Sequence, residues 1–150
     1  MTGRPTWTQS VPTRPAVINA TYSLEETVER MFALPETLRL RGRISLVLLA
    51  EDTGYPQHRA GIDVARLRAA IRGRPGLIDS WLAWSAEKQA DWGWFFEAAD
   101  QRAYLVGCRK HSIEGPWRLA DPEEACARFI KAEFDALLGR QGGSTAPFPR

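Results

Sequence analysis

Residues 81–96 read WLAWSAEKQADWGWFF and hold four of the six tryptophans and two of the six phenylalanines of the chain. The second half of this stretch alternates, so that Trp92, Trp94 and Phe96 would share one face of a strand. Large aromatic side chains on one face need a layer of helices to cover them, because each buries a large apolar area. The stretch therefore predicts a sheet whose aromatic face forms the centre of the core.

The residues that follow are expected to complete this sheet. Tyr104, Val106 and Cys108 alternate in the same way, and AADQR at residues 98–102 suits a turn, which predicts a β-hairpin. Residues 117–119 are expected to add a short third strand. Strands joined by short connections form antiparallel sheets, so the predicted fold class is α+β, with a small antiparallel sheet of three to four strands packed by helices on one face.

Helices are predicted from signals at their ends. Ser23 and Glu26 have the spacing of a capping box, and Asp63 is expected to cap a second helix. Asp121 precedes a proline and two glutamates, which is typical of a helix start, and Gly139 is suited to end that helix. The expected helices lie at residues 24–33, 64–72, 77–84 and 121–138.

The region between the first two helices is expected to contain a strand and a loop. Pro35 would end the first helix, because the residue before a proline resists helical geometry. From residue 38 to 44 the sequence LRLRGRI alternates apolar and basic residues, and residues 46–50 are continuously apolar, which predicts a strand that passes into the middle of the sheet. Residues 51–61 contain glycine and proline and are interpreted as a loop.

The chain length of 150 residues fits one domain. That domain is expected at residues 17–139, between a flexible arm at 1–16 and a flexible tail at 140–150. No apolar stretch is long enough to cross a membrane, and the first residues lack the apolar segment of a secretory signal. Two cysteines fit buried thiols in the reducing cytoplasm, although a single bridge between Cys108 and Cys126 stays open.

Signals for catalysis are absent from the sequence, which has no metal-ligand spacing, no activated nucleophile and no phosphate-binding loop. His58 and His111 lie in expected loops without a neighbouring carboxylate, and both cysteines lie on apolar stripes. Four carboxylates gather around the hairpin without a spacing that selects an acid–base pair: Glu87, Asp91, Glu97 and Asp100. We therefore expect no cofactor, no metal and no enzymatic activity.

Charge is distributed unevenly along the chain, although the net charge is only +2. Residues 38–74 contain eight arginines and three acids, whereas residues 79–138 contain eleven acids and seven bases. Such a separation can steer a charged partner onto the surface. The candidate partner-binding residues, taken from the hairpin and from the arginine-rich stretch, are Asp91, Trp92, Glu97, Asp100, Arg39, Arg41 and Arg43.

Four short motifs follow one another in the C-terminal half: W-x-x-W-S-x-x-K at 81–88, G-W-F-F-E at 93–97, Y-L-V-G at 104–107 and an acid-started amphipathic helix at 121–133. In this order they resemble small bacterial immunity proteins of polymorphic toxin systems. The resemblance implies a cytoplasmic protein that binds and occludes a partner protein, such as a toxin, without performing chemistry. It supplies no catalytic residues for this chain.

Two other functions stay open from the sequence. A nucleic-acid-binding accessory domain could use the arginine-rich face around Arg39, Arg41 and Arg43, but no known DNA- or RNA-binding motif accompanies it. A small enzyme could hold a pocket under the aromatic hairpin. The identity of the partner and the oligomeric state are not fixed by any pattern in the chain.

Overall fold

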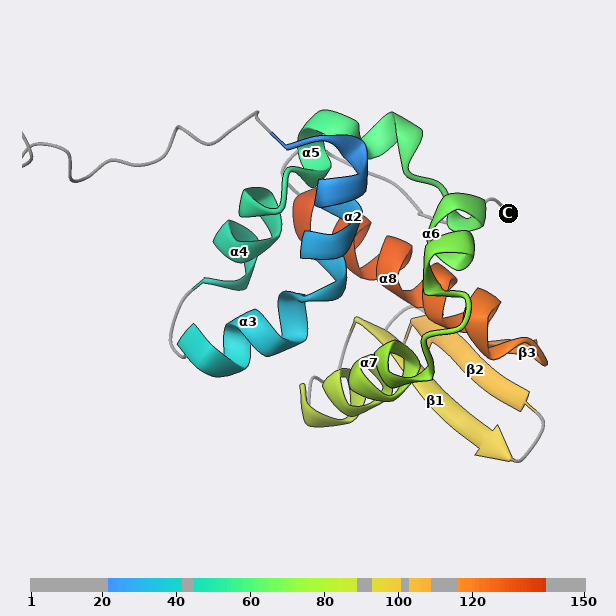
Figure 1. Ribbon diagram of the computed structural model, residues 1–150. Coiled ribbons are helices and arrows are strands. Elements are labelled where there is room, and N and C mark those ends of the chain that lie inside the picture. Colours follow the sequence, from blue (N-terminus) through green and yellow to red (C-terminus); the bar gives the residue numbers. More distant parts are fainter. Residues whose placement is uncertain (1–21, 42–44, 89–92, 101–102, 109–115, 140–150) are drawn as a thin grey trace, which may run out of the picture.

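The computed structural model describes residues 22–41, 45–88, 93–100, 103–108 and 116–139 (Figure 1). The predicted arm at 1–16 and tail at 140–150 lie outside these residues. In chain order the elements of the described part are α2 (Leu24–Phe32), α3 (Leu34–Arg41), α4 (Leu46–Asp52), α5 (Tyr55–His58), the 3-10 helix η2 (Arg59–Gly61), α6 (Val64–Ile71), α7 (Pro75–Glu87), β1 (Trp94–Asp100), β2 (Ala103–Cys108), β3 (Trp117–Leu119) and α8 (Pro122–Gly139).

The sheet is antiparallel and has the strand order β1-β2-β3, which confirms the predicted hairpin, the third strand and the α+β class. The turn predicted at residues 98–102 is wrong in part, because residues 98–100 belong to β1. Its register places Val106 opposite both Phe96 and Trp117. These side chains share one face of the sheet, because cross-strand partners point to the same side. Phe96 and Val106 are buried on that face, as the alternation of aromatic residues predicted.

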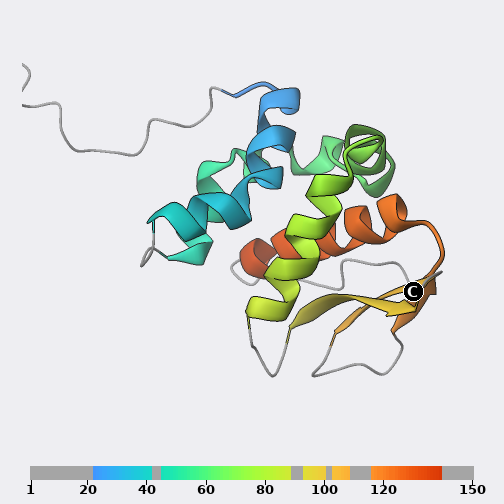
Figure 2. The same cartoon turned by 60° about the horizontal axis from the view of Figure 1, so that its bottom comes forward.

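Helix α8 lies across the aromatic face of the sheet, and α7 lies on the same side along the outer edge of β1 (Figure 2). Phe96 stacks on Phe129 of α8, with ring centroids 5.6 Å apart. At the edge of β1, the backbone N–H of Phe96 donates to Ser85 Oγ at 2.8 Å. Helix α7 therefore satisfies backbone groups of an edge strand that would otherwise be open to pairing with another chain.

Helix α8 is the central helix of the described structure, since it contacts α4, α6, α7 and all three strands. Its apolar stripe includes Cys126, Phe129, Ile130 and Phe134, which are fully buried. The remaining helices pack around its other sides (Figure 1). One hydrophobic cluster thus extends from Val28 on α2 to Leu138 on α8.

The predicted helix starts are confirmed by their hydrogen bonds. Ser23 Oγ accepts from the backbone N–H of Glu26 at 3.0 Å, and the Glu26 carboxylate accepts from the backbone N–H of Ser23 at 2.9 Å. Asp63 caps α6 by accepting from the N–H of Arg66 at 2.8 Å. Asp121 accepts from the N–H of Glu123 at 2.9 Å at the start of α8.

The strand predicted from residue 38 to 50 is wrong for the described residues, because 38–41 lie in α3 and 46–50 lie in α4, while 42–44 lie outside the described ranges. The first helix ends at Phe32, close to the predicted end, but Pro35 occupies the second position of α3, where its missing N–H costs no hydrogen bond, so a new helix begins there. Leu38 is partly buried against the core whereas Leu40 is exposed, so these apolar residues of the alternation do not share a buried face. The loop predicted at 51–61 is also wrong in part, since it contains α5 and η2.

A tight approach explains the glycine before α5. Gly54 has a φ of 93°, and a Cβ there would lie 2.8 Å from Thr27 Oγ1. Glycine is therefore the residue that allows α5 to pack against α2 at this point. Among the described residues, no helix combines the length and the hydropathy required to cross a bilayer.

Candidate functional site

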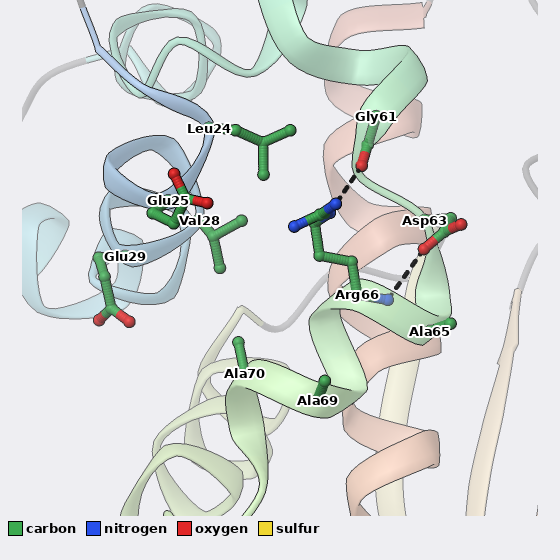
Figure 3. A pocket seen from close by; sticks show the side chains of 10 residues that line it. All are labelled: Leu24, Glu25, Val28, Glu29, Gly61, Asp63, Ala65, Arg66, Ala69 and Ala70. Carbon is green, nitrogen blue, oxygen red and sulfur yellow. Dashed lines mark hydrogen bonds between the residues drawn. The ribbon is translucent and has the colours of Figure 1, made fainter.

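A groove of about 620 Å³ lies between α2 and α6 (Figure 3). Leu24 and Val28 reach into it from α2, and the α6 side is lined by small side chains, including Ala69 and Ala70. The groove forms because α6 turns its large apolar residue Leu67 into the core and its alanines outward. We call this feature, lined by Leu24, Glu25, Val28, Glu29, Gly61, Asp63, Ala65, Arg66, Ala69 and Ala70, the α2–α6 groove.

The rim of the α2–α6 groove is predominantly acidic. It carries the carboxylates of Glu25, Glu29 and Asp63, while the guanidinium of Arg66 extends from α6 into the space between the two helices (Figure 3). Arg66 is held in place by its Nε–H, which donates to the Gly61 carbonyl at 3.0 Å. Glu25 is exposed and makes no ion pair with any residue in the described ranges, so its charge is available to a partner.

Glu29 of the groove is paired with Arg74 at the C-terminal side of α6. The guanidinium donates to both carboxylate oxygens, at 2.8 and 3.0 Å. These hydrogen bonds and the positive charge lower the pKa of Glu29, so the carboxylate stays ionised at neutral pH. The pair links α2 to the segment that follows α6 and holds one end of the groove in shape.

The end of the molecule formed by α3 and α4 is exposed and mixes apolar with basic side chains. Leu40 is 77% exposed and Leu48 is 52% exposed, and they are the exposed large hydrophobic residues of the described chain. Leu40 stands between Arg39 and Arg41, which are also exposed. Arg39 donates to the Glu36 carboxylate at 2.9 Å, one turn earlier on the same helix. We call Arg39, Leu40 and Arg41 the α3 tip.

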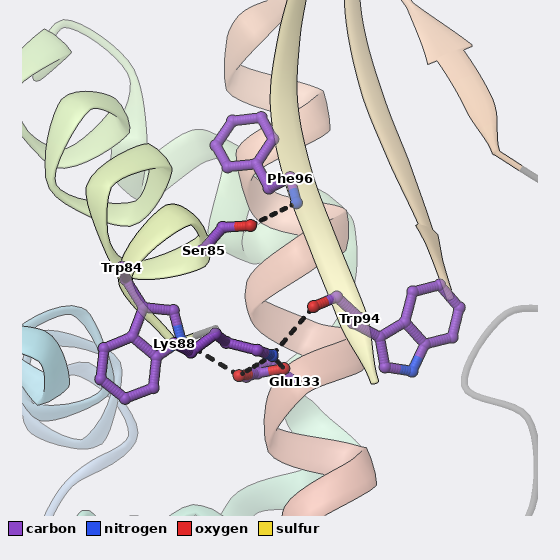
Figure 4. A network of polar contacts seen from close by, with 6 residues as sticks. All are labelled: Trp84, Ser85, Lys88, Trp94, Phe96 and Glu133. Atoms are coloured by element: carbon purple, nitrogen blue, oxygen red, sulfur yellow. Dashed lines mark hydrogen bonds and ion pairs between the residues drawn. The ribbon is translucent and has the colours of Figure 1, made fainter. Parts of the chain in front are cut away.

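A buried ionic contact joins α7, α8 and β1 (Figure 4). Lys88 Nζ donates to both carboxylate oxygens of Glu133, at 3.0 and 2.8 Å, and to the Trp94 carbonyl at 2.8 Å. Trp84 Nε1–H donates to the same carboxylate at 3.0 Å. All three donors of the ammonium group are thereby used, and the contact fixes α7 and the sheet edge to the central helix.

A second polar cluster connects α5 and η2 with α8. The Tyr55 hydroxyl donates to Asp135 Oδ1 at 2.6 Å and accepts from Lys131 Nζ at 2.5 Å, while Arg59 Nε donates to Asp135 at 3.0 Å. Burial raises the pKa of Tyr55, and the hydrogen bond to Asp135 adds to this effect, whereas burial lowers the pKa of Lys131. Tyr55 is fully buried and its hydroxyl already donates and accepts, so a substrate has no access to it.

The predicted partner-binding residues fall on separate parts of the molecule. Glu97 and Asp100 are exposed on β1, and Asp100 accepts from Arg118 Nη2 at 2.7 Å. The α3 tip lies at the opposite end of the structure from the end of the hairpin (Figure 1). The structure therefore does not bring the acidic and the basic candidates together. The other candidates, Asp91, Trp92 and Arg43, lie outside the described residues.

The histidines and cysteines do not form a reactive group in the described structure. His58 Nε2 lies 2.8 Å from the Tyr22 carbonyl and ties α5 to the start of α2, while His111 lies outside the described residues. Cys108 and Cys126 are free thiols, so the bridge that the sequence left open is not formed. Burial raises the pKa of the Cys126 thiol, which disfavours the reactive thiolate. The described ranges contain no group of three or more metal-ligating side chains.

The α2–α6 groove was not among the sites predicted from the sequence. A local signal for one wall existed, since Leu24 and Val28 are four residues apart on a helix. A second signal was the pair Ala65 and Ala69 with the same spacing on the outer side of α6. The groove itself depends on how two helices about 40 residues apart are placed, which no short pattern reports.

Comparison with known proteins identifies no relative of this chain. No protein family model matches the chain, and neither the curated proteins nor the solved structures contain a significant match.

Proposed function

We propose that this chain is a non-enzymatic protein-binding module and that the α2–α6 groove is its principal contact site. The observation that carries the proposal is the combination of an open apolar floor with an acidic rim, because such a surface suits an apolar side chain flanked by basic residues. An open groove between two short helices favours a protein segment over a small molecule, which enclosed pockets bury more fully.

The hydrogen-bond partners of the polar groups support binding over catalysis. The Tyr55 and Glu133 clusters have the residue types of catalytic sites, but their donors and acceptors are occupied by other side chains of the fold. Glu25, in contrast, is exposed at the groove and makes no ion pair with any residue in the described ranges. The groups with capacity for new contacts are thus those that a docking partner would meet, while the enclosed groups stabilise the fold.

The specific form of the proposal is an immunity or antitoxin-like inhibitor that occludes a basic partner protein in the cytoplasm. The motif order in residues 81–133 supports this form, and the free thiols of Cys108 and Cys126 agree with a reducing compartment. Occlusion needs no chemistry from the inhibitor. It needs electrostatic capture followed by an apolar contact that slows dissociation, which the acidic rim and the floor of the groove can supply.

The test compares the wild-type chain with a groove variant that combines Glu25→Lys with Ala69→Arg. Both positions are exposed, so the fold is retained, while the rim charge is reversed and the groove is filled. Each protein is immobilised and used to capture partners from the native host, with growth rescue measured on co-expression of neighbouring toxin reading frames. We expect a stoichiometric partner that the wild type binds and the groove variant loses. A partner retained equally by both proteins would contradict the groove as the contact site.

A further inference from the structure

The α3 tip has the chemistry that the α2–α6 groove lacks. The groove offers an apolar floor with carboxylates on its rim, and the tip offers an exposed leucine between two arginines. Arg39 is partly neutralised by Glu36, but Arg41 makes no ion pair with any other described residue. The two surfaces are therefore complementary in both polarity and charge.

A single molecule cannot bring these surfaces together. Helices α2 and α3 are separated by one residue, Ala33, and α3 and α6 lie on opposite sides of α2 in both views (Figures 1 and 2). The tip is at the far end of α3 from that connection, so it points away from the groove of its own chain. The complementarity can be satisfied only between two molecules.

We propose that a second copy of this chain docks its α3 tip into the α2–α6 groove, in a head-to-tail arrangement. This inference rests on the proposed role of the groove as a protein-binding site and names one of its occupants. Leu40 lies on the floor formed by Leu24 and Val28, and the arginines of the tip face Glu25 and Asp63 on the rim. Each molecule then inserts its α3 tip into one neighbour and receives the tip of another neighbour in its α2–α6 groove.

The dimensions of the helices agree with this arrangement. Helix α2 has nine residues and α6 has eight, so each wall of the groove is about 12 to 14 Å long at a rise of about 1.5 Å per residue. The α3 tip spans three residues, or about 4.5 Å of helix, and fits within this length. The alanines on the α6 wall allow a helix to approach closely, because they add little bulk between the two backbones.

The interface is heterologous, since different surfaces meet, and it does not close on itself in a pair. The contact is small, so association is weak and reversible, in the class of transient interfaces that bury less than about 1,200 Å². The charges at the contact are exposed, so salt weakens it. A foreign partner that binds the groove more tightly displaces the second copy by mass action.

The experiment measures the mass of the purified full-length chain by analytical ultracentrifugation over a roughly hundredfold dilution series. The first variant alters only the tip, with Leu40→Asp and Arg41→Glu, and the second is the groove variant Glu25→Lys with Ala69→Arg. All four positions are exposed, and circular dichroism confirms that both variants are folded. We expect the wild type to grow beyond a dimer with concentration and each variant alone to stay monomeric.

The decisive sample is an equal mixture of the two variants. The tip variant keeps its groove and the groove variant keeps its tip, so one productive contact remains and the mixture forms a dimer and nothing larger. A wild type that is monomeric at every concentration overturns the proposal. So does a mixture that stays monomeric, or a groove variant that still associates, because the latter would show that two tips or another surface pair instead.

Capture of a foreign partner by the tip variant tests the proposed function separately. The tip variant is monomeric and retains an intact α2–α6 groove, so it captures a foreign partner if the groove has that role. Loss of self-association with retained capture supports both proposals. Self-association without any foreign partner retains the inference and removes the inhibitor function.

Discussion

Two carboxylate–cation pairs link distant helices in this molecule, and they differ mainly in their exposure to water. Lys88 and Glu133 join α7 to α8 with side chains that are 20% and 6% exposed, whereas Arg74 and Glu29 join the segment after α6 to α2 with side chains that are 43% and 55% exposed. The distances are similar, at 2.8 Å in both cases. The inner pair also binds a tryptophan and a backbone carbonyl, while the outer pair stands at the rim of a groove.

The same kind of ion pair therefore has two different roles, which depend on its exposure to water. An enclosed pair has left water at a high cost in free energy, so removing one partner leaves a charge that nothing else can solvate. An exposed pair exchanges its contacts with water at little cost, and it can rearrange when a partner arrives. The α7–α8 region is therefore a scaffold, and the α2–α6 region is suited to recognition. Substitutions in the two regions test this contrast, and the largest effect is expected in the scaffold.

Lys88→Met should be the most destabilising of these changes. The substitution keeps the apolar stem of the side chain but leaves Glu133 as a buried, unpaired carboxylate, and it removes the donor to the Trp94 carbonyl. We expect the free energy of unfolding to fall by about 3–5 kcal/mol. The measurement is urea denaturation followed by circular dichroism.

A double variant, Lys88→Met with Glu133→Gln, provides the control. The glutamine is neutral and keeps an oxygen for Trp84 Nε1–H, so the double variant should be more stable than Lys88→Met alone. If both variants lose the same free energy, the uncompensated charge is not the cause of the loss.

Tyr55→Phe tests the second enclosed cluster and should have an intermediate effect. It removes the hydroxyl that lies between Asp135 and Lys131 while preserving the ring contact with Phe134. We expect a loss of about 1–3 kcal/mol in the free energy of unfolding, because two buried polar groups lose a partner. Tyr104→Phe, at a half-buried tyrosine on β2, is the matched control and should stay within about 0.5 kcal/mol of the wild type. Equal losses at the two tyrosines would contradict a special role for the cluster.

Ser23→Ala should have a smaller effect, at the wall of the groove. It removes the oxygen that accepts from the Glu26 N–H and breaks the capping box of α2. The expected loss is about 1 kcal/mol. Thermal denaturation would report it, and Ser23→Asp, which can supply an equivalent oxygen, should restore most of the stability. An unaffected alanine variant would mean that α2 is held by its packing alone.

The smallest effect concerns the pH dependence of the exposed pair. Arg74 lowers the pKa of Glu29 in the folded state below the ordinary value of 4.5, so the unfolded chain binds the proton more readily. The stabilisation by this pair is complete above that value and is lost as the pH falls through the lower folded pKa. At neutral pH, Arg74→Gln should cost no more than about 1 kcal/mol, because both side chains are largely exposed. Chemical denaturation at about pH 7 and about pH 3 should show a smaller difference from the wild type at the lower pH.

The sequence indicates the structure of the C-terminal half more clearly than that of residues 38–50. The C-terminal half was predicted well, because its aromatic residues alternate on a strand and because Asp121 and Pro122 mark a helix start without ambiguity. Residues 38–50 were misassigned. In so short a segment, alternating leucines and arginines fit a strand as well as a helix, and arginine and leucine both favour helices.

The candidate site was less predictable than the fold. Arg39 and Arg41 are exposed, but they project from a helix and not from the predicted strand, and their role in partner binding stays a prediction. The groove was missed because its two walls come from separate helices whose relative position is set by α8 and the core. Local patterns report which side of a helix is apolar, and they do not report which two helices leave a gap.

The position of α8 along the chain has a consequence for biosynthesis. This helix follows every other described element, yet it contacts helices on one side and all three strands on the other. During translation, the earlier segments leave the ribosome with indole and phenyl rings that have no surface to cover them. The core around α8 can form only after residues 122–139 have emerged, so folding is completed at the end of this helix and apolar rings that α8 covers stay exposed until then.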